Sequence, residues 1–412
     1  MHKVVVIGAG INGVSAAIWA RRMGCEVTLV DKAAPGMGAS FGNAGVLAAS
    51  AVVPLTTPGL LWRAPGMLMD REFPLFVRYG YLPRMAGWLA RYLSHANDRD
   101  CRRIAGALGP VVTDSLDQHM ALTEGLSARR FVHGSDYVYA YPDRAAMRAD
   151  AYGWALKAEA GFMPEVIEGG AVQEYEPALG PGVGCLAVMK GHGRISDPGG
   201  YVAALAQDFE AMGGRVLRAE VMDFDLDGGR LRAVRTDRGP LEADRAVLAL
   251  GAWSKGLMAR LGLRVPMETE RGYHLLLKDP SVMPRVPVMV ASGQFVATPM
   301  EMGLRLAGIA ELGGLEAGPS EAPIALLKRQ VRRAFPTLDW QSEETWMGHR
   351  PAPSDSLPLV GEVAGTGVFA AFGHHHVGLT GGAKTGRWVA SLLTGQRVNA
   401  DLSAYDPMRF RK

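Results

Sequence analysis

The sequence predicts an α/β fold with α+β character, in which a Rossmann-like nucleotide-binding domain is combined with a discontinuous, sheet-based second domain. The first observation is a βαβ pattern at the N-terminus, with a β-branched strand at residues 4–7, a helix at 15–23 and a strand at 26–30. The second observation is a β-meander at 216–246 that leads into a buried strand at 246–250.

Three glycines separate the first strand from the first helix, at the G-x-G-x-x-G spacing of a dinucleotide-binding turn. Gly8 permits a tight turn, Gly10 lets the backbone approach a pyrophosphate, and Gly13 lets the helix pack closely on the strand. Asp31 ends the second strand, about 20 residues further on, where a carboxylate accepts hydrogen bonds from an adenosine ribose and repels a 2′-phosphate. A glycine-rich turn of another α/β protein is the alternative, but the order of the elements favours a dinucleotide.

The composition is that of a globular protein of more than one domain. The chain has 412 residues, of which 48% are hydrophobic and 21% are charged. A net charge of +3 with scattered arginines gives no indication of nucleic-acid binding. The three cysteines are widely separated and are expected to be reduced thiols. With no signal-peptide pattern and no apolar run of about 18 residues, we expect a cytoplasmic protein that is soluble or at most peripheral on the inner face of the membrane.

Two segments near the N-terminus have unusual compositions. Small residues dominate positions 32–45, which suits a backbone that lies against a flat ligand or a phosphate chain, although a flexible connector is the alternative. Prolines interrupt positions 54–93, which are dense in leucine, methionine and aromatic residues, and the best helix there is 82–93 with Arg84 and Arg91 on one face. This helix could dock on a membrane surface, but burial against the body of the protein is preferred.

The middle of the chain alternates irregularly and has no second nucleotide turn, so we expect an inserted domain there. Its expected elements are a helix at 102–125, a strand at 131–141, a helix at 145–161 and a strand at 184–189.

Regularity returns with a helix at 198–212, which Asp197 caps and Pro198 begins. A meander that completes the first βαβ unit is typical of glutathione-reductase-type flavoproteins, whereas a nicotinamide dehydrogenase continues with further βαβ units. This topology favours FAD over NAD. The remaining expected elements are meander strands at 216–224, 231–236 and 241–246, strands between 265 and 296, a helix at 321–335, a strand at 368–372 and a helix at 382–393.

The domains are expected to alternate along the chain. The FAD-binding domain takes residues 1–80, 193–265 and 346–412, and the substrate domain takes 81–192 and 266–345.

Four motifs in order make the chain similar to a known family. They are the glycine fingerprint, Ser-Phe-Gly-Asn-Ala-Gly at 40–45, Arg-Gly-Tyr-His at 271–274, and Gly-His-Arg-Pro-Ala-Pro-Ser-Asp-Ser-Leu-Pro at 348–358 with the Gly-His…Gly-Leu-Thr element at 373–380. Over nearly its whole length the chain resembles the D-amino-acid oxidase (DAO) superfamily of FAD enzymes, and within it the bacterial D-amino-acid dehydrogenases.

The resemblance implies a set of FAD-binding residues. The ADP half would be held by Gly8, Ala9, Gly10, Ile11, Asn12, Gly13, Asp31 and Lys32. The pyrophosphate and isoalloxazine would be lined by Ser40, Asn43, Ala44, Gly45, Val46 and Leu47. Val221 would contact adenine through its backbone, and Gly251 and Trp253 would close over the cofactor. The pyrimidine edge of the flavin would be reached by the backbone of His375, His376, Val377, Gly378, Leu379 and Thr380.

The resemblance also implies catalytic residues. Arg271 and Arg350 would bind the substrate carboxylate, since a planar guanidinium binds it in bidentate fashion. Tyr273, His274 and His374 would hydrogen-bond the substrate or accept the amine proton. No metal site is expected, because three consecutive histidines at 374–376 cannot converge on one ion in an extended turn.

The implied activity is oxidative deamination of a D-amino acid to the 2-oxo acid and ammonia, with hydride transfer to flavin N5 and electrons passed to a quinone or another carrier. The imidazoles after His374 depart from the smaller residues usual in the bacterial dehydrogenases. A cyclic or N-substituted amino acid, such as D-hydroxyproline, is therefore an alternative substrate. An oxidase that uses oxygen and a non-catalytic FAD subunit of a larger dehydrogenase complex are alternative functions.

Overall fold

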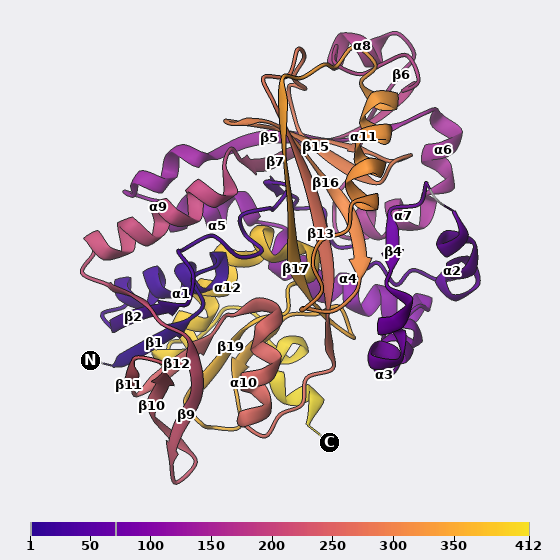
Figure 1. Cartoon of the computed structure of the whole chain (residues 1–412). Coiled ribbons are helices and arrows are strands. Elements are labelled where there is room, and N and C mark those ends of the chain that lie inside the picture. Colours follow the sequence, from indigo (N-terminus) through magenta and orange to yellow (C-terminus); the bar gives the residue numbers. More distant parts are fainter. Residues whose placement is uncertain (1, 71, 412) are drawn as a thin grey trace.

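The computed structural model describes residues 2–70 and 72–411, and it arranges them around two large sheets and one small sheet (Figure 1). The first large sheet has six strands in the order β18–β19–β12–β1–β2–β8. Neighbouring strands are parallel, except that β18 is antiparallel to β19. The strands are β1 (Lys3–Ile7), β2 (Glu26–Asp31), β8 (Arg215–Arg218), β12 (Arg245–Leu248), β18 (Leu359–Glu362) and β19 (Val368–Phe372).

The central strand β1 is covered on both faces, which explains its unbroken run of β-branched residues. Val4 and Val6 pack in the cluster formed with α1, α9 and α12, whereas Val5 and Ile7 pack toward α10 and the small antiparallel sheet β11–β10–β9. These elements are α1 (Ile11–Arg22), α9 (Pro198–Ala211), α10 (Ser254–Arg260), α12 (Gly378–Leu393), β9 (Val221–Asp227), β10 (Arg230–Thr236) and β11 (Gly239–Glu242).

The second large sheet has ten strands and is mainly antiparallel. Its main path is β17–β13–β16–β15–β14–β5–β7–β3, with β4 paired to β16 and β6 paired to β7. The strands are β3 (Val46–Leu47), β4 (Leu75–Val77), β5 (Val132–Tyr141), β6 (Glu165–Glu168), β7 (Cys185–Ile195), β13 (Met267–Lys278), β14 (Val288–Val290), β15 (Phe295–Met300), β16 (Gly303–Leu312) and β17 (Ser342–Pro353).

The remaining helices lie beside this second sheet or against α12 (Figure 1). They are α2 (Leu60–Met69), α3 (Leu82–Ser94), α4 (Asp98–Val112), α5 (Ser115–Leu122), α6 (Arg144–Ala149), α7 (Ala151–Glu159), α8 (Ala171–Tyr175) and α11 (Ala322–Ala334). Short 3₁₀ helices lie at Tyr79–Tyr81, Ser127–Phe131, Gly251–Trp253, His375–Val377, Ser403–Tyr405 and Pro407–Phe410. Among the described helices, none is both long and apolar enough to cross a membrane.

Two helices predicted as continuous are each divided by an aspartate. The predicted helix 102–125 is α4 and α5, because Asp114 leaves the helical conformation and its carboxylate binds Lys384 of α12 at 2.7 Å. The predicted helix 145–161 is α6 and α7, with Asp150 between them. Aspartate favours such breaks because its short carboxylate competes with the helical backbone.

Three further expectations need correction. The predicted strand 216–224 is two strands in different sheets, since β8 joins β2 and β9 begins the small sheet. Asp197 precedes α9, but its side chain makes no capping hydrogen bond. The helix predicted from residue 382 begins at Gly378.

The alternation of domain segments stays a proposal. Strand β17 crosses the division proposed at residue 345, since it remains paired with β13 as far as Pro353. The short strands β3 and β4, within the segment 1–80, also join the ten-stranded sheet. Residues 1, 71 and 412 of these segments lie outside the described part of the chain.

Gly13 tests the packing of α1 on the nucleotide turn. A Cβ at this position would lie 1.8 Å from the carbonyl oxygen of Gly8, so we expect Gly13→Ala to lower the free energy of unfolding by about 2–3 kcal/mol. The measurement is chemical denaturation. Gly106→Ala in α4 is the control, because no atom lies within 4 Å of its added Cβ. Equal stability of the Gly13 variant and the wild type would contradict the tight packing.

Candidate active site

A cavity of about 1800 Å³ extends from the nucleotide turn to the ten-stranded sheet. At one end it is lined by the turn after β1, the end of β2 and the segment 32–44. At the other end it is lined by side chains of β5, β13 and β17 and by helices α2 and α3. The turn that precedes α12 lies along it, so segments from the whole length of the chain meet at one space.

The conformation of the nucleotide turn is fixed by side chains that accept hydrogen bonds from its backbone amides. The amide of Ala9 donates to Asp31 Oδ2 at 2.7 Å, and the amide of Ile11 donates to Ser40 Oγ at 3.0 Å. Gly8 has a φ of 108°, and a Cβ there would lie 2.5 Å from the oxygen of Ala249. The N-terminus of α1 therefore faces the cavity with its positive dipole end, which suits a phosphate group.

Most of the predicted cofactor-binding residues line this cavity. Those that do are Ala9, Gly10, Ile11, Asn12, Asp31, Lys32, Ser40, Asn43, Ala44, Val46, Val221, Gly251, Trp253, His375, His376, Val377, Gly378, Leu379 and Thr380. Four do not, namely Gly8, Gly13, Gly45 and Leu47. The three glycines lie behind the cavity wall. The side chain of Leu47 is fully buried in the core of the six-stranded sheet and does not line the cavity.

The residues present fit a dinucleotide cofactor. Asn12 Oδ1 is buried without a hydrogen-bond partner among the described atoms, on a residue of the cavity wall. A donor from a bound ligand would satisfy it. Asp31 accepts the amides of Ala9 and Ala33, one on each oxygen, and carboxylate oxygens can accept further bonds from a ribose.

The turn before α12 brings three histidines to the cavity in different environments. His374 is buried, with Nε2 2.9 Å from Thr385 Oγ1 and Nδ1 3.4 Å from Asn12 Nδ2, and burial lowers its pKa to about 3. His375 has a φ of 49°, which makes the turn sharp. His374 is therefore neutral at physiological pH. His376 is exposed to the cavity, and desolvation by the surrounding protein lowers its pKa below the usual value, which favours the neutral ring there as well.

Glu270 joins this turn to the ten-stranded sheet. It lies directly opposite Arg350 in the β13–β17 ladder, which places both side chains on one face. Its Oε1 accepts from Arg350 Nη1, and its Oε2 lies 2.9 Å from His375 Nε2. Burial by itself would raise the pKa of Glu270, but His375 and Arg350 outweigh that effect and hold it well below its usual range.

Arg350 remains open to the cavity. Its side chain is 23% exposed, and only Nη1 has a protein partner among the described contacts. A Cβ on Gly272 would lie 2.6 Å from the guanidinium, so the glycine lets Arg350 lie flat against β13. The arrangement leaves the rest of a planar, charged donor group available to a ligand.

Arg271 does not line the cavity, so the structure does not bring this predicted substrate-binding residue together with Arg350. Side chains alternate along β13, so Arg271 points away from Glu270 and Arg350. It is 0% exposed, with Nη1 2.7 Å from Glu311 on the neighbouring strand, and Nη2 donates to Ala317 O at 2.7 Å. Tyr273 contributes to the cavity wall, but its hydroxyl donates to Glu311 at 2.6 Å.

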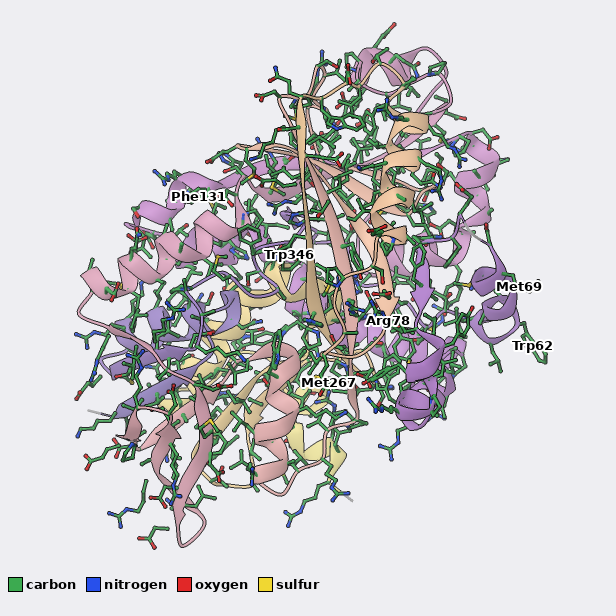
Figure 2. All side chains as sticks on the ribbon, in the orientation of Figure 1. Trp62, Met69, Arg78, Phe131, Met267 and Trp346 are labelled. Atoms are coloured by element: carbon green, nitrogen blue, oxygen red, sulfur yellow. The ribbon has the colours of Figure 1, made fainter. Side chains whose placement is uncertain are left out.

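His274 is likewise a structural residue rather than a cavity residue. Its Nδ1 lies 3.2 Å from Gly42 O, and its ring stacks on Trp346 with centroids 5.3 Å apart. Trp346 lies near the centre of the molecule in Figure 2. Burial, together with the charge of Arg305, lowers the pKa of His274 to about 3. The ring therefore braces the segment 41–43 against the sheet.

Sequence reasoning missed several cavity residues. Glu270 is the most important, and its signal was its position two residues before Gly272, on the same face of a strand. Other side chains of the sheet end of the cavity are Tyr92, Tyr137, Tyr139, Lys157, Trp346 and His349. In the described residues, no cluster of three or more histidine, cysteine or acidic side chains is placed to bind a metal ion.

Removal of the negative charge of Glu270 tests whether this residue connects Arg350 to the turn before α12. We expect Glu270→Gln to lower the free energy of unfolding by about 3 kcal/mol at pH 7, because Arg350 loses a buried partner. The pKa of Glu270 is depressed in the folded state, so its contribution is present above about pH 4.5 and is lost as the pH falls. The difference between the two proteins should therefore shrink below pH 4.5 in urea denaturation.

Glu344→Gln is the matched control for this experiment. Glu344 is also on β17 and pairs across the ladder with Lys278, but it is exposed, and we expect a change within about 0.5 kcal/mol. Similar losses in both variants would show that the charge of Glu270 has no special role.

Comparison with known proteins identifies the family. The model of the DAO family, described as FAD dependent oxidoreductase, matches residues 3–392. The chain is 38% identical to a D-amino-acid oxidase of Bradyrhizobium diazoefficiens, over 99% of each chain. It is 29% identical to a D-amino acid dehydrogenase of Rhizorhabdus wittichii, over 96% of this chain and 97% of the relative.

Solved structures share the fold. Glycine oxidase from Geobacillus kaustophilus superposes with a TM-score of 0.77 at 21% identity, over 99% of each chain. L-proline dehydrogenase from P. horikoshii superposes with a TM-score of 0.73 at 20% identity, over 99% of this chain and 97% of the other. The glycine fingerprint, the cavity and these matches agree: the chain belongs to the DAO family of FAD-dependent oxidoreductases, with FAD as its cofactor.

Proposed function

We propose that this amino-acid oxidoreductase deaminates a D-amino acid oxidatively to the 2-oxo acid and ammonia, and that a quinone or another carrier receives the electrons. The observation that carries this proposal is the guanidinium of Arg350, held by Glu270 at one nitrogen and otherwise facing the cavity. The names of the relatives, a D-amino-acid oxidase and a D-amino acid dehydrogenase, support the D configuration and leave both oxygen and another acceptor open.

The residues of this chain would position the substrate. FAD, when bound, accepts a hydride from the α-carbon. Arg350 would bind the α-carboxylate and so fix which face of the α-carbon is presented, and orientation of this kind accounts for much of the barrier reduction. Glu270 is a positioning residue, because it holds Arg350 in place without using its remaining donors.

The two neutral histidines would differ in role. Both ring nitrogens of His374 already face Thr385 and Asn12, so we propose that it positions the turn and does not take the amine proton. His376 opens to the cavity as a neutral ring, which can accept a hydrogen bond from the substrate amine. The imidazole rings of these histidines reduce the space for the side chain of a substrate. A cyclic or N-substituted amino acid is therefore the second candidate substrate.

The test is anaerobic flavin reduction by a panel of D- and L-amino acids and imino acids. We expect D-amino acids to bleach the flavin of the purified chain. In Arg350→Met we expect kcat/KM for carboxylate substrates to fall about 100-fold or more while FAD stays bound, because a charged hydrogen-bonding partner is removed. Reoxidation by oxygen with release of peroxide would identify an oxidase, and reoxidation by a quinone would identify a dehydrogenase.

Several outcomes would count against this function. If no D-amino acid reduces the flavin and a cyclic or N-substituted amino acid does, the second candidate replaces it. If only L-amino acids reduce the flavin, the proposed D configuration is wrong. If no compound of the panel reduces the flavin, the chain is a non-catalytic FAD subunit. Unchanged kinetics in Arg350→Met would remove that residue from the site.

We also propose that α2 contacts a membrane that holds the acceptor. Its residues Trp62 and Met69 are 86% and 83% exposed and project from the edge of the molecule in Figure 2. Other residues of the same helix, Leu60 and Met67, line the cavity, so the helix lies between the cavity and the outside. Exposed aromatic and apolar side chains on a helix that also carries Arg63 suit the interface of an anionic bilayer.

Flotation with phosphatidylglycerol vesicles tests this contact. We expect the wild type to float with the vesicles and Trp62→Ser with Met69→Ser to reduce the bound fraction severalfold, because apolar area drives insertion. Met163→Ser removes an exposed methionine from a different segment and should have no effect. Equal flotation of all three proteins, or none with the wild type, would contradict the proposal.

A further inference from the structure

The far end of the cavity contains a buried lysine that has no anionic partner. Lys157, on α7, is 6% exposed and lines the cavity. Its Nζ lies 4.0 Å from the ring centre of Tyr139 and 4.1 Å from that of Trp154. In the described part of the chain, no carboxylate comes within ion-pairing distance of it. A buried ammonium is costly, and contact with aromatic faces offsets only about 2 kcal/mol of that cost.

The acids at the two ends of α7, Asp150 before it and Glu159 as its last residue, have other partners. Asp150 accepts a hydrogen bond from Tyr141 at 3.1 Å, and Glu159 pairs with Arg102 on the surface. The positive charge of Lys157 is therefore directed at the cavity without being neutralised by its own surroundings. Such a charge in a ligand cavity attracts an anionic group and favours it over a neutral group of the same shape.

The shape of the ten-stranded sheet brings this lysine to the same cavity as Arg350. Strand β13, next to the edge strand β17, reaches the turn before α12 through Glu270 and His375, 2.9 Å apart. The edge strand β3 reaches the first turn of α12, where Thr380 Oγ1 donates to the oxygen of Val46 at 3.3 Å. Strands from both sides of the sheet thus contact one short stretch of chain, and Lys157 and Arg350 line the same cavity. Tyr139 packs in the same cluster as Val46.

We propose that Lys157 binds a second carboxylate of the substrate, so that the site prefers a D-amino acid with an acidic side chain. Arg350 would bind the α-carboxylate and Lys157 the distal one. The rings of Tyr139 and Trp154 hold the ammonium in place and exclude water from it. This inference rests on the proposed function, because it assigns the α-carboxylate to Arg350.

The experiment compares acidic substrates with neutral ones of similar shape. The pairs are D-aspartate with D-asparagine, D-glutamate with D-glutamine, and D-2-aminoadipate with D-norleucine. We expect the acidic member of at least one pair to have the higher kcat/KM, and the best pair reports the distance between the two cationic groups. N-carboxymethyl-D-alanine tests whether the second carboxylate is instead carried on the substrate nitrogen.

Variants of the lysine test its charge. We expect Lys157→Met to lower the ratio of kcat/KM for acidic over neutral substrate by about 10- to 100-fold, and Lys157→Arg to retain most of it. Lys190→Met is the matched control, since Lys190 also lies over a tyrosine ring but is exposed and paired with Asp136. It should leave the ratio unchanged.

Binding without turnover gives a second measurement. Glutarate and butyrate are titrated against the oxidised holoenzyme, and their dissociation constants are read from the change in flavin absorbance. We expect glutarate to bind more tightly than butyrate in the wild type, and this advantage to disappear in Lys157→Met.

The outcomes separate the two proposals. If neutral D-amino acids reduce the flavin but acidic ones are never preferred, or if Lys157→Met leaves the ratio and the glutarate advantage unchanged, the role of Lys157 is wrong and the function stands. If no D-amino acid reduces the flavin while glutarate still needs Lys157 for tight binding, the function is wrong and the anion site stands.

Discussion

The bridge from Arg350 through Glu270 to His375 is the interaction on which the site depends. It connects the strand pair β13–β17 of the ten-stranded sheet to the turn before α12. Helix α12 packs against the six-stranded sheet. The three side chains come from positions 80 and 105 residues apart in sequence. A carboxylate with two charged or polar partners is stabilised in a buried place, and removal of any partner leaves an uncompensated group. The carboxylate of Glu270 therefore helps to fix the two halves of the cavity relative to each other.

Other polar contacts reinforce the same junction. Thr380 of α12 donates to Val46 on the edge strand β3, while His375, just before α12, contacts Glu270 on β13. Fully buried His119 lies 2.8 Å from Tyr201 and 2.9 Å from the oxygen of Leu379, which ties α5 and α9 to the same helix. Burial lowers the pKa of His119 to about 4, so it acts there as a neutral ring. The start of α12 is thus held from several directions by hydrogen bonds.

The elements formed by residues close in sequence were predictable, because the residues that determine them lie within one short segment. The turn from β1 to α1 needs glycines at fixed spacing, and Asp31 follows at the end of the next strand. Arg350 was identified through the family resemblance, and the cavity includes it. Helix breaks at Asp114 and Asp150 were missed, because one of them is fixed by Lys384, far away in sequence.

The functional face of a strand is where sequence reasoning failed. Arg271 and His274 belong to the same motif as Gly272, but which of them faces the cavity is decided by the register of β13 with β16 and β17 and by an irregularity between Gly272 and His274. That register depends on residues up to 86 positions away, as in the pair Met267 and Pro353. Glu270 and Lys157 were missed for a related reason, since a single acid or lysine carries no pattern until its distant neighbours are known.

Arg305 holds the segment 41–43, next to predicted FAD-binding residues, in position before the cofactor binds. From the middle of the ten-stranded sheet its guanidinium donates to the oxygen of Phe41 at 3.0 Å and to that of Asn43 at 2.9 Å. The conformational entropy of this loop is consequently lost when the chain folds, not when the flavin arrives. FAD then binds to a loop that is already ordered, so little conformational entropy of the loop is lost on binding. The affinity for FAD is therefore set by the contacts between the cofactor and the protein.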